Sequence, residues 1–584
     1  MLDFPTLQLE ILSELYGESA AIPILNELRA KVVKYRKKIE EQFHSETKLT
    51  ERDMMLITYG DQVSEAGKPP LQSLADFCIR NLSGLVNCLH ILPFYPYSSD
   101  DGFSVKDFRQ VNAALGGWDD IARLHEHYRL MFDGVINHVS VQSEWFRAFL
   151  HNENNYREYF IVIQGEPDLS KVVRPRTQPL LTRFSEYPNE KSVWTTFSAD
   201  QVDLNYTNPR VLLEIIDVLL FYVSHGAEFI RLDAIAYLWK EIGTPCIHLP
   251  QTHRVIQLFR AILDEVAPDV KLITETNVPH LDNISYFGNG ANEAQLVYNF
   301  ALAPLVLHTI HTGDARALSR WASSLSLPSD QVTFFNFLAS HDGIGLNPVR
   351  GILNNEAIDA LVQRAVAHGG LISYKQNPDG TKSPYELNIN YFDALSNPGD
   401  VESLDIQVDR FMSAQAIMLS LVGMPGIYFH SLFGSRGWLQ GVRQTGHNRT
   451  INRQKFSRKE LEQALADASN LRYRVFNRFT QLLRARTASQ AFDPYGIQKV
   501  VECGDAIFAL LRLAPKTNER VLCLQNVTTH PQFLSLNFDD IFDLQSERAP
   551  IVNLIDGERI EGGSQSTLRL SPYQVCWLNL QKSP

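Results

Sequence analysis

The segment Ile230-Arg231-Leu232-Asp233-Ala234-Ile235-Ala236-Tyr237 decides which fold this sequence predicts. An apolar run from Gly226 leads into it, and the turn-forming residues Gly243-Thr244-Pro245 follow it. The pattern predicts a buried strand whose carboxyl end carries a charged pair, Arg231 and Asp233. In a parallel barrel, active sites form at that end of the strands. The pair alone fits a structural ion pair at a strand tip equally well, because such pairs also satisfy buried charges.

Two later segments repeat this pattern. Val270-Lys271-Leu272-Ile273-Thr274-Glu275 is an apolar strand that ends in a carboxylate, and Phe335-Asn336-Phe337-Leu338-Ala339-Ser340-His341-Asp342 is another. Three strands therefore bring one carboxylate each to the same rim. Carboxylates are rarely buried without partners, so three convergent ones indicate chemistry. Glycoside chemistry needs such groups, one as nucleophile or base and one as an acid with a raised pKa.

Strand-like and helix-like segments alternate from Met54 onward. Strands predicted at residues 55–59, 85–93 and 130–138 alternate with helices, and the alternation continues to residues 426–429. This order predicts βαβ units and a mostly parallel sheet. The number of units favours an α/β fold, a (β/α)8 TIM barrel with inserted loop domains and a C-terminal all-β domain.

The predicted domains follow from where this alternation starts, stops and is interrupted. Two polar, loop-rich stretches interrupt it, and we name them the first insertion (139–205) and the second insertion (343–405). Both leave the rim that carries the carboxylates, so we expect them to cover an active site. The remaining predicted parts are a helical N-terminal extension at 1–53, the barrel at 54–138, 206–342 and 406–488, and a C-terminal β-sandwich at 489–584.

Composition excludes several classes of protein. The net charge of −12 argues against a nucleic-acid partner bound through its phosphates, but it leaves room for a small anion held by a few arginines. No secretory signal or apolar membrane span is recognisable, and the six cysteines are scattered, so we expect a cytoplasmic protein. The N-terminal helices could serve as an interface, and we expect a monomer or a homodimer. No cluster has the ligand spacing of a zinc or EF-hand site, so no metal is predicted.

Four ordered motifs carry a family resemblance: Asp133-Gly134-Val135-Ile136-Asn137-His138, then Ile230-Arg231-Leu232-Asp233-Ala234, then Thr274-Glu275, then Ser340-His341-Asp342-Gly343. With them the chain resembles the α-amylase-type glycoside hydrolases of family 13, and within these the sucrose phosphorylase group. The resemblance covers about residues 54–580. It implies that Asp233 is the nucleophile, Glu275 the general acid/base and Asp342 the carboxylate that steadies the transition state.

The resemblance also implies how the glucosyl unit is bound. Arg231 would keep Asp233 ionised, because a nearby guanidinium favours the carboxylate form. His138 and His341 on their own are ambiguous, since a histidine after a strand is often structural. The full implied set of glucose-binding residues is Asp100, Phe103, His138, Phe197, Gln201, Arg231, His341 and Arg453.

A phosphorylase also needs cationic or hydroxyl donors where a hydrolase admits water. The resemblance places these phosphate and acceptor-binding residues at Arg174, Arg176, Tyr237, Asn277, Tyr385 and Glu386. For Arg174 and Arg176 a solvated loop charge is the alternative. No cofactor is implied beyond inorganic phosphate as co-substrate.

Two positions depart from the sucrose phosphorylase pattern, which typically has Val-His after the acid/base and glutamine after the loop tyrosine. This sequence has Thr276-Asn277 and Glu386 there, and so looks more like the glucosylglycerate phosphorylase branch. Asn277, Arg350 and Lys375 are candidates for binding a glycerate carboxylate. Glu386 would repel it directly, but would suit orienting an arginine or binding hydroxyls.

The predicted function is therefore a retaining α-glucoside phosphorylase. Glucosylglycerate is the first expected substrate, sucrose or glucosylglycerol are the alternatives, and a phosphate-independent glucosidase or transglucosidase comes third. A catalytically inactive barrel that serves as a binding subunit is the alternative from another class. The intact set of three carboxylates argues against it, because such clusters are maintained for chemistry.

Overall fold

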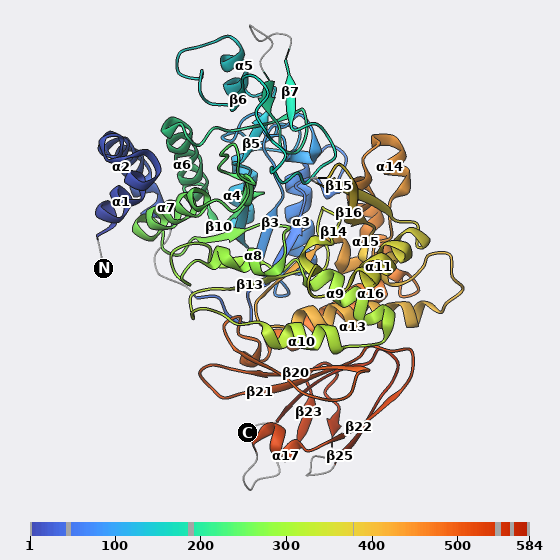
Figure 1. The fold of residues 1–584 in the computed structure, drawn as a ribbon. Coiled ribbons are helices and arrows are strands. Elements are labelled where there is room, and N and C mark those ends of the chain that lie inside the picture. Colours follow the sequence, from blue (N-terminus) through green and yellow to red (C-terminus); the bar gives the residue numbers. More distant parts are fainter. Residues whose placement is uncertain are drawn as a thin grey trace.

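A closed parallel barrel of eight strands forms the centre of the molecule, as the computed structural model in Figure 1 shows. The structure describes residues 3–42, 48–184, 192–377, 379–543, 550–560 and 566–580. The barrel strands are, in their order around it, β1 (Met55–Thr58), β17 (Met424–Tyr428), β13 (Thr333–Asn336), β12 (Leu296–Tyr298), β11 (Lys271–Thr274), β10 (Ala227–Leu232), β4 (Arg129–Gly134) and β3 (Cys88–Ile91). The predicted (β/α)8 barrel is confirmed.

The barrel strands are almost fully buried, as expected for parallel strands that helices cover on the outside. Proline occupies the first turn of three of these helices, where the missing N–H costs nothing. The larger helices around the barrel are α3 (Pro70–Leu82), α4 (Trp118–His125), α6 (Pro209–Val223), α7 (Pro250–Val266), α9 (Leu302–Thr312), α10 (Arg316–Ser324), α13 (Leu404–Ser420) and α16 (Leu471–Thr487).

Strand register sets the level of the candidate catalytic residues. Leu232, the last residue of β10, pairs with Thr274, the last residue of β11. The next residue of each chain segment is a carboxylate, and the Glu275 N–H donates to the Leu232 carbonyl at 3.2 Å. Asp233 and Glu275 therefore leave the barrel at the same level on neighbouring strands.

The first insertion is more ordered than the predicted loop-rich cover. Its ends pair with each other as β5 (His138–Ser140) and β9 (Gln201–Asp203), which closes the insertion at its base. Beyond them lie α5 (Glu144–Leu150) and a sheet of β6 (Val162–Ile163), β8 (Ser192–Trp194) and β7 (Leu181–Arg183). Apolar side chains such as Trp194 give this sheet a small core of its own.

The second insertion also contains regular structure. Strand β16 (Lys382–Asn388) lies between β14 (Ile344–Gly345) and β15 (Leu371–Gln376) in an antiparallel sheet. Helices α11 (Asn355–Ala367) and α12 (Tyr391–Leu395) flank it in the sequence. Alternation of polar and apolar residues is weak in β15 and β16, which explains why the sequence pattern did not reveal these strands.

Helices α1 (Phe4–Tyr16) and α2 (Glu18–Glu40) pack on the outside of the barrel against α6 and α7 (Figure 1). Two acids of those barrel helices, the buried Asp217 and the partly buried Glu265, anchor α2. Glu265 of α7 forms ion pairs with Arg29 and Arg36, and Asp217 of α6 accepts hydrogen bonds from Lys34 and Tyr35, each at 3.1 Å.

The C-terminal part of the chain is mainly β-structure and packs against α10 and α13, at the bottom of Figure 1. A six-stranded sheet has the order β19 (Ile497–Val500), β20 (Ile507–Leu513), β21 (Arg520–Asn526), β26 (Val575–Leu580), β23 (Ile551–Asn553) and β24 (Arg559–Ile560). A two-stranded sheet consists of β22 (Gln532–Leu536) and β25 (Ser566–Leu570). Among the described helices, none combines the length and the apolar character that a membrane crossing requires.

Candidate active site

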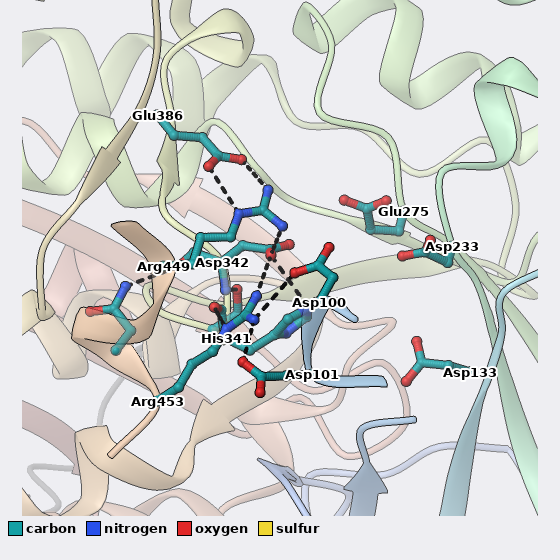
Figure 2. Close-up of polar contacts among 12 residues, drawn as sticks. Asp100, Asp101, Asp133, Asp233, Glu275, His341, Asp342, Glu386, Arg449 and Arg453 are labelled. Atoms are coloured by element: carbon teal, nitrogen blue, oxygen red, sulfur yellow. Dashed lines mark hydrogen bonds and ion pairs between the residues drawn. The ribbon is translucent and has the colours of Figure 1, made fainter. Parts of the chain in front are cut away.

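One pocket of about 610 Å³ is lined by all three carboxylates that the strand ends predicted. Asp233 directly follows β10, Glu275 directly follows β11, and Asp342 lies in the loop after β13. Figure 2 shows Asp233 and Glu275 next to each other, with Asp342 on the side of Arg449 and Arg453. The fold therefore brings together groups that are far apart in the sequence.

Arg231 orients Asp233. Its Nη1 atom donates to Asp233 Oδ1 at 2.9 Å and to Asp133 Oδ1 at 2.5 Å, and its side chain is 2% exposed. Asp133 is in turn held by His90 Nε2 at 2.7 Å. Asp133 lies on β4 and Asp233 directly follows the adjacent strand β10, so the guanidinium between them gives the Asp233 carboxylate one fixed direction.

A strained residue fixes Glu275. Ala234 has a φ of +49°, in the left-handed region that residues with a side chain rarely occupy. In this conformation its N–H donates to Glu275 Oε2 at 3.0 Å. Strain of this kind is found where the surrounding structure over-determines a functional geometry.

Burial raises the pKa of both neighbouring carboxyl groups, to a higher value at Glu275 than at Asp233. It raises the pKa of Glu275 to about 7, with further upward contributions from the charges of Asp233 and Asp342. Burial also raises the pKa of Asp233, to about 6, while Arg231 opposes that rise. The two groups titrate as a pair. As the pH rises, Asp233 loses its proton before Glu275 does. This order suits a protonated acid beside an ionised nucleophile.

Asp342 has the opposite environment. Burial disfavours its charged form, but the guanidinium groups of Arg449 and Arg453 outweigh it and lower the pKa of Asp342. Arg449 Nη1 lies 2.6 Å and Arg453 Nη2 lies 3.7 Å from Asp342 Oδ1. This third carboxylate is therefore held ionised beside the other two.

The residues expected to bind glucose gather around these carboxylates. Arg231 lies behind Asp233, and the other seven line the pocket: Asp100, Phe103, His138, Phe197, Gln201, His341 and Arg453. Phe103 stacks on His341 with ring centroids 4.7 Å apart. His138 Nε2 and Gln201 Nε2 both lie 2.9 Å from the Phe103 carbonyl oxygen, which fixes this aromatic platform.

A second strained turn presents Asp100. Asp100 and Asp101 have φ values of +52° and +47°, and Gly102 follows with a φ of +113°. A side chain at Gly102 would come within 2.5 Å of the Pro93 carbonyl oxygen, so only glycine fits there. Arg453 Nη1 holds the turn through Asp101 at 2.7 Å and Asp100 at 3.3 Å.

The expected acceptor-side residues divide into two groups. Five of the six line the pocket: Arg176, Tyr237, Asn277, Tyr385 and Glu386. Arg174 does not; its guanidinium donates to the Gln178 carbonyl oxygen within its own loop, and its placement at the acceptor side stays a prediction.

Two of the three candidates for binding a glycerate carboxylate lie outside the pocket lining. Arg350 and Lys375 do not line the pocket, whereas Lys382 at the start of β16 does. Both Lys375 and Lys382 belong to the β15–β16 hairpin, where Lys375 pairs with Ser383 and Lys382 with Gln376, so the two lysines lie on opposite faces of the hairpin. The sequence alone does not say which of the two lysines lies on the pocket side of the hairpin, because it does not show the strand register.

Sequence reasoning also missed Arg449 and Asp101, which line the pocket. Arg449 precedes the predicted Arg453 by one helical turn, and no strand-end motif marks it. Within the described ranges, no group of three or more histidine, cysteine or acidic side chains is arranged to hold a metal ion.

Comparisons with known proteins agree with this geometry. Residues 80–343 match the model of the α-amylase catalytic domain. The chain is 50% identical, over 97% of each sequence, to a glucosylglycerate phosphorylase from Spirochaeta thermophila, and 31% identical to a sucrose phosphorylase from Agrobacterium vitis over 75% of this chain and 88% of that one.

Among solved structures, the sucrose 6F-phosphate phosphorylase from Thermoanaerobacter thermosaccharolyticum superimposes with a TM-score of 0.73 at 24% identity, covering 88% of this chain and 99% of that one. At this identity the match establishes the fold alone. The near full-length sequence match carries the assignment further: the chain belongs to the glucosylglycerate phosphorylase family of the α-amylase-type glycoside hydrolases.

Proposed function

We propose that this protein is a retaining α-glucoside phosphorylase that transfers the glucosyl group of glucosylglycerate to inorganic phosphate. The observation that carries the proposal is the buried pair on neighbouring strand ends, Asp233 oriented by Arg231 and Glu275 with a pKa raised to about 7. Retaining glycoside chemistry uses such a pair, one carboxylate as nucleophile and one carboxylic acid as proton donor. No metal or organic cofactor takes part in the proposed reaction.

The proposed reaction has two displacements. Asp233 attacks the anomeric carbon while Glu275 gives its proton to the glycosidic oxygen, so glycerate leaves and a covalent glucosyl ester of Asp233 forms. A phosphate oxygen then attacks the anomeric carbon and the Asp233 ester bond breaks. Glu275 takes the proton of the phosphate hydroxyl, which returns it to the acid form. Two inversions give α-glucose 1-phosphate with overall retention.

Arg176 and Tyr385 are the proposed phosphate contacts. Arg176 comes from the first insertion and lies over the ring of Tyr385 from the second, 5.4 Å from its centroid. A guanidinium provides a planar set of donors that matches phosphate oxygens. Because the two residues come from different insertions, closing both over the barrel completes this part of the pocket.

Asn277 is the proposed reader of the acceptor. Its Oδ1 atom is buried and accepts no hydrogen bond from any described residue, although it lines the pocket. A buried acceptor without a partner is costly, so a hydroxyl of the leaving glycerate is a fitting donor. Glu386 forms ion pairs with Arg449 and Arg176. These cations balance its negative charge, so Glu386 does not repel the glycerate carboxylate as an unpaired anion would.

Release of glucose 1-phosphate from glucosylglycerate, glucosylglycerol and sucrose, each with and without phosphate, tests the proposal. Phosphate-dependent product from glucosylglycerate alone supports it. Product from sucrose instead would keep the mechanism and replace the acceptor. Free glucose released at the same rate without phosphate would reject the phosphorylase assignment and leave a hydrolase on the same carboxylates.

A further inference from the structure

Arg449 is a cation that lines the pocket, and no strand-end motif of the sequence predicts it. It lies in the short 3-10 helix η6 (Asn448–Asn452), and its side chain is 18% exposed. In Figure 2 it stands between Asp342 and Glu386. Its neighbours on the two sides come from the barrel and from the second insertion.

Glu386 fixes the plane of the Arg449 guanidinium. Arg449 Nη2 donates to Glu386 Oε1 at 2.6 Å, and Arg449 Nε donates to Glu386 Oε2 at 3.2 Å. Two parallel bonds of this kind define both the distance and the orientation of the pair. The Glu386 side chain is only 2% exposed, and its backbone on β16 pairs with Gly345 and Ser373 on the two neighbouring strands. The sheet of the second insertion therefore sets the direction of Arg449.

The other end of the same guanidinium faces Asp342. Arg449 Nη1 lies 2.6 Å from Asp342 Oδ1, closer than Arg453 Nη2 at 3.7 Å. Asp342 Oδ1 nevertheless accepts no hydrogen bond with good geometry from the described residues. Arg449 thus attracts this carboxylate while leaving it able to accept a hydroxyl of a substrate.

We propose that Arg449, clamped by Glu386, is a positioning residue that holds the Asp342 carboxylate in the direction needed to bind the glucosyl group. The inference rests on the proposed function only in placing a glucosyl unit beside Asp342. Glu386 acts through Arg449 and not on the glucosyl unit. A strand of the second insertion thereby controls the geometry of a carboxylate that the barrel supplies.

The pH profile distinguishes this role from a merely structural one. Several charged or titratable groups influence the pKa of Asp342 or lie beside it. They are Arg449, Arg453, Arg231, Arg176, His341, Asp233 and Glu275. His341 is buried and flanked by Arg231 and Arg453, so its pKa is low and it is neutral. Arg449 is the largest of the cationic influences that lower the pKa of Asp342. Removing its charge raises that pKa. The acidic limb of the activity profile has an upper inflection near pH 6, which Asp233 sets, and a lower inflection, which Asp342 sets; the lower inflection therefore moves to higher pH.

The test uses α-D-glucosyl fluoride as donor and fluoride release as readout. Fluoride leaves without protonation, so this reaction reports on the glucosyl side of the pocket and not on the acceptor. The variants are Arg449→Met, Arg449→Lys and Glu386→Gln. Arg474→Met is the matched control, because Arg474 pairs with Asp405 on the exposed surface away from the pocket. Thermal unfolding of each variant checks the fold.

For Arg449→Met we expect kcat/KM to fall about 10- to 100-fold, because a charged contact is lost, and the lower inflection of the acidic limb to move to higher pH. Arg449→Lys keeps the charge but not the two-pronged contact, so the rate falls while the limb stays in place. Glu386→Gln removes a negative charge and weakens the clamp, so the rate falls and the limb does not move up. Arg474→Met behaves as wild type.

An Arg449→Met enzyme within twofold of the wild-type kcat/KM, or one with a lower rate and an unmoved lower inflection, overturns the inference. If that variant does not fold, Arg449→Lys and Glu386→Gln decide, and wild-type rates in both overturn it equally. The proposed function fails separately: a wild type that releases fluoride but forms no glucose 1-phosphate from any glucoside rejects the phosphorylase and leaves the role of Arg449 testable.

Discussion

The Lys240 ammonium lies 2.6 Å from the Asp203 carboxylate, and their side chains are 3% and 0% exposed. Lys240 Nζ also donates to Asn137 Oδ1 at 2.8 Å. Asp203 ends β9 and Asn137 directly precedes β5, so both stand at the base of the first insertion. Lys240 comes from the segment after Asp233. This buried ion pair therefore ties the first insertion to the strand that carries the candidate nucleophile.

Replacing Lys240 by methionine is expected to destabilise the protein by about 3–5 kcal/mol, because it leaves the Asp203 charge buried without its cation. The free energy of unfolding from denaturant titration measures the effect. The double variant Lys240→Met with Asp203→Asn removes both charges and should regain part of the loss. A double variant as unstable as the sum of the two single changes would show that the pair is not coupled.

Asp233→Asn tests the nucleophile. The amide keeps the shape and the hydrogen bond to Arg231, so we expect an unchanged unfolding temperature and a loss of kcat of about 1,000-fold or more, since covalent catalysis is lost. Glucose 1-phosphate release under saturating phosphate measures it. Turnover near the wild-type rate would assign the nucleophile to another residue.

The sequence predicted the barrel and its three carboxylates because each is marked locally, by an apolar strand that ends in a charge. The family resemblance implied a sugar-binding role for Asp100, but no pattern in the sequence indicated its left-handed turn. Contacts between insertions were not foreseeable. Arg449 and Glu386 are 63 residues apart, and their pairing depends on the register of β16, which the sequence pattern does not reveal. The position of Arg174, whose guanidinium bonds within its own loop, likewise depends on loop geometry that the sequence does not show.

Glu275 predicts a narrow pH profile. The acid step needs Glu275 protonated, so kcat/KM for glucosylglycerate should fall as the pH rises through about 7. It should also fall as the pH drops through about 6, where Asp233 takes up a proton.

Glu275→Gln should lower phosphorolysis by about 100- to 10,000-fold. With α-D-glucosyl fluoride the variant should form the glucosyl ester much more readily, since fluoride needs no acid.

The same raised pKa makes a prediction about stability. A carboxyl group whose pKa is higher in the folded state binds its proton more tightly there, so the folded state loses stability as the pH rises from about 4.5 to about 7. Glu275→Gln has no charge to bury and should unfold at a higher temperature than wild type at pH 8, with a smaller difference at pH 5. An equal difference at both pH values would contradict the raised pKa.

Gly345 leaves room for the side chain of Asn277. A methyl group added at Gly345 would lie 2.5 Å from Asn277 Oδ1 and 2.7 Å from its Nδ2, distances that force the amide to move. Gly345 lies in β14, whose partner strand β16 carries Glu386, so the backbone has little freedom to yield. Gly345→Ala should therefore displace the proposed acceptor reader without touching the candidate catalytic carboxylates.

We expect Gly345→Ala to lower kcat/KM for glucosylglycerate about 10- to 100-fold, because a displacement of about 1 Å in a positioning group costs that much. Fluoride release from α-D-glucosyl fluoride should change far less, since that donor has no glycerate. Gly399→Ala is the matched control; its added methyl would meet a single atom, at 3.4 Å. Adding Asn277→Ala to Gly345→Ala removes the clash, so the double variant should equal Asn277→Ala alone. Equal losses on both donors would mean that Gly345 supports the whole pocket and that Asn277 does not read the acceptor.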